Sequence, residues 1–162
     1  MSWKVLPVDE KKLRECVAAC RRAGVRYGLG SKAPTLSAEP GKHFSRIDCS
    51  GFVRWAIYKA TDGTVIMPDG SWFQAAWARK QGFKESTSES CLLKDGRVRL
   101  AYWKNKQSAG ISHIALVLNG KTLESHGSRG PNRRAWSLET GWMRDAEVWV
   151  LEMDTDHEGG NG

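Results

Sequence analysis

Asp48-Cys49-Ser50-Gly51-Phe52-Val53-Arg54-Trp55 predicts the beginning of a helix with a thiol in its first turn. Asp48 is a favourable N-cap residue, because its carboxylate can accept hydrogen bonds from the first free backbone amides. Apolar residues then recur at helical spacing as far as Ala60. The helix dipole and unpaired amides at such a position favour a thiolate, so Cys49 is a candidate nucleophile.

Length and composition indicate one folded domain. The chain has 162 residues, of which 40% are apolar and 27% charged. We expect the domain to span residues 1–153 and the tail, 154–162, to be disordered. The net charge of +7 favours an anionic partner, such as a cell-wall polymer, a membrane surface or nucleic acid. No apolar run reaches the ~20 residues of a membrane span, and residues 1–9 lack the long apolar stretch of a secretory signal.

The other three cysteines, Cys16, Cys20 and Cys91, do not predict a disulfide framework, which a chain of this length does not need. Cys16 and Cys20 are four residues apart on a predicted helix and are interpreted as small buried apolar residues. No second ligand pair stands at a spacing suited to zinc. We therefore expect neither a metal nor any other cofactor.

The order of predicted elements is helices first and strands afterwards. Helices are expected at 9–23, 49–60 and 72–80, and a long loop at 31–47. Strands are expected at 98–102, 113–118, 121–125 and 146–153. The strand at 98–102 is expected to be half-buried, and the strand at 113–118 to be covered on both faces. Asn119-Gly120 is expected to form the hairpin turn between 113–118 and 121–125. The sequence therefore predicts an α+β domain with an antiparallel sheet.

A nucleophilic cysteine needs a base within reach and usually a third group that orients the base. His113 begins the apolar strand, and His126 follows the predicted hairpin, which could return it beside His113. One imidazole could then take the Cys49 proton while the other fixes its tautomer. Taken singly, each residue also fits a structural role, a core cysteine or a satisfied histidine at a strand end.

Several motifs together resemble the NlpC-type bacterial cell-wall cysteine peptidases, which are papain-like enzymes that cut the peptide stems of peptidoglycan. The motifs, in the order of that family, are Tyr27-Gly28-Leu29-Gly30, Asp48-Cys49-Ser50-Gly51-Phe52-Val53, Met67-Pro68 with Ser71 and Gln74, His113-Ile114-Ala115-Leu116-Val117-Leu118, and His126. The resemblance implies a papain-like fold. It also implies that Cys49 is the nucleophile, His113 the general base and His126 the orienting residue.

The same resemblance implies several substrate contacts. Tyr27 matches a tyrosine beside the nucleophile that helps bind substrate or the oxyanion, and the Cys49 amide is a plausible second oxyanion donor. Asp48 and Ser50 match residues lining the pocket that receives the N-terminal end of the stem. In the basic loop at 127–136, Arg129 could bind stem carboxylates, or the loop could simply be solvated.

Three features depart from the pattern of the family. The loop at 31–47 is longer than the usual link and could form a lid; its His43 is interpreted as a surface residue that could compete as a base. Leu29 stands where many relatives have a glycine or an aromatic residue. We expect no wall-binding module to accompany the catalytic part.

The leading hypothesis is a peptidoglycan hydrolase that cleaves the bond between D-glutamate and the diamino acid through a thioester on Cys49. Alternatives are an amidase or acyltransferase of the same fold, and a non-catalytic module that binds wall glycan or nucleic acid. For the leading hypothesis we expect a monomer that binds peptidoglycan stem peptides and anionic wall polymers, with no specific nucleic acid partner and with an immunity or delivery protein. Without a signal peptide, we expect synthesis in the cytoplasm and delivery to the wall or periplasm by a phage particle or specialised secretion.

Overall fold

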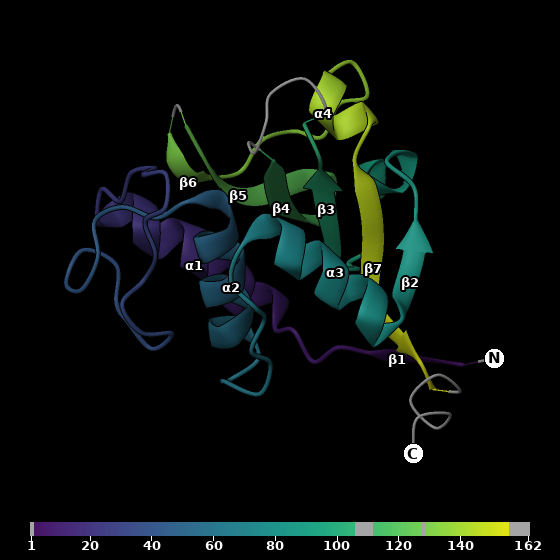
Figure 1. Cartoon of the computed structure of the whole chain (residues 1–162), viewed down its shortest axis with the longest axis horizontal. Helices are drawn as coiled ribbons and strands as arrows, with labels where there is room; N and C mark the ends of the chain where they lie inside the picture. The colour runs from purple at the N-terminus through teal and green to yellow at the C-terminus, as the bar shows by residue number, and fades with distance from the viewer. Residues whose placement is uncertain (1, 106–111, 128, 156–162) are drawn as a thin grey trace.

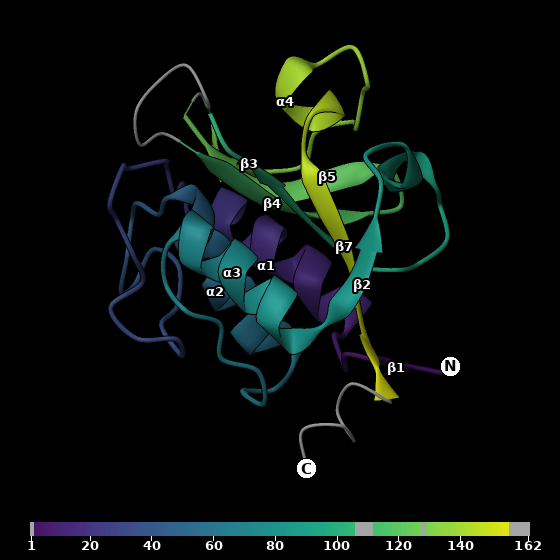
Figure 2. The same ribbon diagram turned by 45° about the vertical axis from the view of Figure 1, so that its right-hand side comes forward.

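A computed structural model gives the fold, and it describes residues 2–105, 112–127 and 129–155. Three helices lie on one face of an antiparallel sheet (Figures 1 and 2). The helices on this face are α1 (Glu10–Arg22), α2 (Cys49–Ala60) and α3 (Ser71–Gln81). The expected α+β arrangement is confirmed: this is a mixed domain with an antiparallel sheet and four helices.

The sheet has seven strands in the described part of the chain, in the order β1-β7-β3-β4-β5-β6, with β2 also paired to β7. The strands are β1 (Trp3–Val5), β2 (Phe83–Ser86), β3 (Arg99–Trp103), β4 (His113–Leu118), β5 (Lys121–His126), β6 (Gly130–Asn132) and β7 (Glu147–Asp154). The Asn119-Gly120 turn between β4 and β5 has positive φ at both residues, 52° and 78°, as a type I′ hairpin requires. This turn fixes the register of the two strands that carry the candidate site residues.

The helix boundaries follow from local chemistry. The Asp9 side chain caps α1 through the Lys12 amide, and the Asp48 side chain caps α2 through the Gly51 amide. The predicted Asp48 cap is confirmed. In α3, Phe73 is 59% exposed, while Gln74 is fully buried. Gln74 is buried because its amide donates to the backbone oxygens of Ser50 (2.8 Å) and Pro68 (3.1 Å).

Apolar side chains cover both faces of the sheet. The larger core lies between α1, α2, α3 and the sheet, and a smaller one lies on the opposite face. The smaller core includes residues of β3, β4 and β7, a 3-10 helix, η1 (Glu89–Leu92), and a short helix, α4 (Gly141–Arg144). β3 is therefore not half-buried as expected; Arg99, on its second face, is 3% exposed because it pairs with Asp95 at 2.7 Å.

The predicted end of the domain needs a small correction. Asp154 belongs to β7, and the Thr155 amide donates to the Ser2 carbonyl at 3.1 Å, so the ordered sheet continues past residue 153. The rest of the expected tail, 156–162, lies outside the described residues. The loop at 31–47 contains no helix or strand, as expected, only isolated bridges such as Arg26 to Arg46. All four cysteines are free and buried.

Candidate active site

Cys49 and His113 lie together where the N-terminus of α2 meets the first residue of β4. Cys49 is the first residue of α2 and is 8% exposed, and the amide of Gly51 donates to Asp48 Oδ1 at 2.8 Å. A second hydrogen bond ties the segment before α2 to the sheet: the hydroxyl of Ser125, on β5, donates to the Ile47 carbonyl at 2.7 Å. The nucleophile candidate is therefore fixed to both the helix and the sheet.

The His113 ring joins the thiol to a buried carboxylate. Its side chain is hydrogen-bonded to Cys49, and its Nε2 lies 2.7 Å from Glu124 Oε1. Burial alone would lower the pKa of His113, but the hydrogen bonds and charges of Cys49 and Glu124 outweigh it and raise the pKa to about 9. The site thus favours an imidazolium beside the sulfur, as a cysteine nucleophile needs.

Glu124, which contacts His113, is a residue of this arrangement that the sequence analysis missed. Its side chain is fully buried, and both carboxylate oxygens accept from Arg134, one of them from Nε at 3.1 Å. Burial acts to raise the pKa of Glu124, but hydrogen bonds from His113 and Arg134 lower it to about 2. Glu124 and His126 are two residues apart in β5 and so share one face of the strand, which was the available signal.

An aromatic residue covers the same histidine. The Trp142 ring, from α4, contacts the His113 ring edge to face, with centroids 4.7 Å apart. The Arg134 guanidinium lies 5.5 Å from the centroid of the Trp142 ring, in cation–π geometry. Trp142 therefore packs against both the imidazole and the arginine that holds Glu124. Nothing in the spacing of the sequence indicated this contact.

His126 ends β5, one residue beyond the serine that bonds to Ile47. Its side chain is mostly buried, and its pKa is lowered, first by burial and then by the charge of Arg134. The hairpin has brought His126 near the site, since the charges of Glu124 and His113 also act on it. The predicted orienting role of His126 stays a prediction, and the described contact to Nε2 of His113 is made by Glu124.

Tyr27 and Asp48 also lie close to the nucleophile. Burial, followed by the charges of Cys49 and Asp48, raises the pKa of Tyr27, so its hydroxyl stays protonated and able to donate. Asp48 and Ser50 are not open to a ligand as they stand, because Lys32 binds both. Its Nζ lies 2.7 Å from each Asp48 carboxylate oxygen and 2.8 Å from Ser50 Oγ. No motif in the sequence pointed to this lysine.

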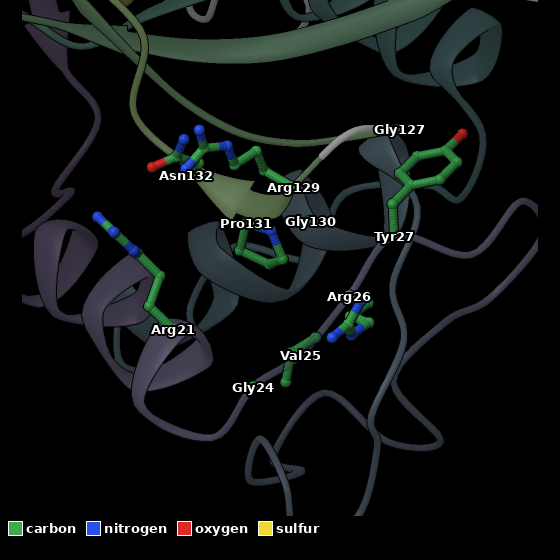
Figure 3. A pocket seen from close by; sticks show the side chains of 10 residues that line it. All are labelled: Arg21, Gly24, Val25, Arg26, Tyr27, Gly127, Arg129, Gly130, Pro131 and Asn132. Atoms are coloured by element: carbon green, nitrogen blue, oxygen red, sulfur yellow. The ribbon is translucent and has the colours of Figure 1, made fainter.

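Arg129 lines a pocket of about 450 Å³ that adjoins Tyr27 (Figure 3). Among its lining residues are three arginines: Arg21 from α1, Arg26 from the segment that follows, and Arg129 from the segment before β6 (Figure 3). No acidic residue lines this pocket in the part of the chain that the structure describes. Three guanidinium groups around one cavity favour an anionic ligand.

His43, which was predicted as a surface residue that could compete as a base, is held within its own loop. Nδ1 of His43 accepts from the Glu39 amide at 2.9 Å, which ties the ring into its own loop. Within residues 2–105, 112–127 and 129–155, no group of three or more His, Cys, Asp or Glu residues could hold a metal ion. The same residues include no helix that is long and apolar enough to cross a membrane.

Comparison with solved structures gives a similar fold. The P60 domain of an antigen from M. avium subspecies paratuberculosis superposes with a TM-score of 0.50 at 19% sequence identity, over 86% of this chain and 97% of that domain. The fold is therefore consistent with the NlpC/P60 type that the sequence motifs resemble. No protein-family profile matches the sequence, and neither does any curated protein.

Proposed function

We propose that this protein is a cysteine peptidase that hydrolyses the peptide stems of peptidoglycan. One observation carries the proposal: Cys49 begins a helix and its side chain is hydrogen-bonded to His113, whose Nε2 lies 2.7 Å from the buried Glu124 carboxylate. This sequence of contacts supports the roles of nucleophile, base and orienting group in thiol catalysis. The likeness to a P60 domain and the motifs around Cys49 support the choice of substrate.

The proposed chemistry proceeds through a thioester. The Cys49 sulfur attacks the scissile carbonyl, and the oxyanion accepts hydrogen bonds from the Cys49 amide and the Tyr27 hydroxyl. His113 gives its proton to the departing amine, then takes a proton from a water molecule that attacks the thioester. The carboxylic acid leaves and Cys49 is restored. By resemblance, the bond cleaved lies between D-glutamate and the diamino acid.

We propose Glu124, in place of His126, as the residue that orients the base. A carboxylate that accepts from Nε2 leaves Nδ1 to face the sulfur and stabilises the charged ring. Arg134 keeps Glu124 ionised and in place. His126 then acts on the site through packing and charge.

Arg129 is assigned to substrate carboxylates together with Arg21 and Arg26, whose pocket adjoins Tyr27. Stem peptides carry free carboxylates, so this pocket offers them a positive anchor beside the scissile bond.

A protein with this activity must reach the wall. Delivery by a phage particle or a specialised secretion machine remains our proposal for that route.

The test is digestion of purified sacculi, with products identified by mass. The wild-type protein should release peptides with a new amine terminus inside the stem, and Cys49→Ala should release none while its melting temperature stays close to wild type. Cys91→Ala, at a buried cysteine in the smaller core, is the matched control and should retain activity. Full activity in folded Cys49→Ala would refute the proposal. Release of intact stems from the lactyl group would instead identify an amidase.

A further inference from the structure

The Lys32 ammonium occupies a position beside the buried Asp48 carboxylate, which directly precedes Cys49 in the chain. Its Nζ contacts both carboxylate oxygens of Asp48 at 2.7 Å and the hydroxyl oxygen of Ser50 at 2.8 Å. Asp69 adds a second carboxylate at 3.1 Å. The Asp48 side chain is 9% exposed and that of Lys32 is 31% exposed, so the carboxylate is buried and the lysine partly buried.

The long loop at 31–47 brings this lysine to the helix N-terminus. The Asp48 amide donates to the Ser31 carbonyl at 2.8 Å, which anchors the start of the loop beside the cap. The fit is close: a Cβ added at Gly51 would lie 3.0 Å from Lys32 Cδ and 2.8 Å from Asp48 Oδ1. The part of the chain that departs most from the family pattern therefore supplies the cation.

A buried carboxylate next to a nucleophile would ordinarily bind a cationic group of the substrate, because an unpaired charge there is costly. In this chain Lys32 already pairs with the buried Asp48, whereas Asp69, on the other side of the ammonium, is 52% exposed and its pairing is screened by solvent. A substrate ammonium would first have to displace Lys32, and it would only replace one cation at Asp48 with another. The position next to Cys49 thus offers no advantage to an amine.

We propose that Lys32 is a specificity-determining residue that takes the place of a substrate ammonium, so that the enzyme accepts stems whose N-terminal amine is acylated. This inference rests on the proposed peptidase function for its substrate. An N-acylated stem is one still attached to its glycan strand. The protein would therefore act on intact wall rather than on released, free-amine peptides.

The first test compares two forms of one stem peptide, with a free and with an acetylated N-terminal amine. The wild-type protein should cleave the acetylated form at least as well. Lys32→Met frees Asp48 and should raise the ratio of kcat/KM for the free over the acetylated peptide about tenfold. Lys42→Met, in the same loop but 72% exposed, changes the charge equally and should leave the ratio unchanged. A wild-type preference for the free amine, or an unchanged ratio in Lys32→Met, would overturn the proposal.

The second test needs no peptidase activity, so it separates this inference from the proposed function. Cys49 is modified with 2-aminoethyl methanethiosulfonate, which is cationic, and with methyl methanethiosulfonate, which is neutral. Any change in thiol reactivity affects both rates and cancels in their ratio. Lys32→Met should raise the ratio of cationic to neutral rate about tenfold, and Lys32→Arg should stay near wild type. Equal ratios in wild type and Lys32→Met would refute the role of Lys32 even if no peptide is cleaved.

Discussion

Replacing Glu124 with glutamine tests whether the buried carboxylate holds the His113 ring in its charged form. The substitution keeps the size of the side chain and its ability to hydrogen-bond, but removes the charge that lies 2.7 Å from Nε2. The pKa of His113 should fall from about 9, because burial would then be opposed by the interactions with Cys49 alone. The change should be visible in the pH dependence of folding stability.

The linkage between proton binding and folding gives the sign and size of the expected change in the free energy of unfolding. A histidine whose folded pKa is raised above its unfolded value of 6.5 adds stability that is fully present below pH 6.5 and is lost as the pH rises through about 9. At ~1.4 kcal/mol per pKa unit, the deprotonation of His113 lowers the free energy of unfolding by about 3 kcal/mol over that pH range. Cys49 and Glu124 share the stabilisation, so Glu124→Gln should reduce the fall by roughly 1 to 2 kcal/mol.

The measurement is urea unfolding of wild type and variant at several pH values from 6 to 9. The buried thiols of Cys16, Cys20 and Cys91, whose pKa values burial raises to about 12, contribute alike to both proteins and cancel in the difference. Glu147→Gln, at an exposed carboxylate paired with Arg79, is the control and should keep the wild-type slope. If the free energy of unfolding of Glu124→Gln falls with pH as steeply as that of the wild type, the proposed coupling between Glu124 and His113 is refuted.

Three further variants test the residues around the site. Exchanging both Arg21 and Arg26 for glutamine should raise KM about tenfold for a stem with a free carboxylate and leave KM unchanged for its amidated form, as steady-state kinetics would show. Gly130→Ala should lower the free energy of unfolding by about 2 kcal/mol or more in urea titrations, because φ is +77° and the new Cβ would lie 2.7 Å from the Val25 carbonyl oxygen. His126→Asn should reduce kcat less than Glu124→Gln does; a larger reduction would restore His126 as the orienting residue.

Local signals in the sequence predicted the elements that carry the proposed nucleophile and the proposed base. The Asp48 cap, the helical repeat after it and the Asn119-Gly120 turn are short-range features, and the structure places α2, β4 and the turn at the predicted residues. The approach of Cys49 to His113 follows once the helix packs on the sheet. Such features can be read from one sequence because each is determined within a few residues.

The residues that were missed depend on long-range packing. Glu124 matters because Arg134 returns to it from beyond β6, and Trp142 because α4 folds over the second face of the sheet. The prediction of a half-buried β3 failed for a related reason, since η1 and α4 form a second core that no periodic pattern announced. Lys32 is one cation of 25 in the sequence, and only its position against Asp48 distinguishes it.

Asp48, beside Cys49, and Glu124, beside His113, are both buried carboxylates that pair with a cation of the chain itself. Asp48 is neutralised by Lys32, and Glu124 by Arg134, so neither leaves an unpaired negative charge at the site. The adjoining pocket adds the guanidinium groups of Arg21, Arg26 and Arg129. Guanidinium groups attract carboxylates and repel amines, so this pocket suits an acidic stem better than a free-amine peptide.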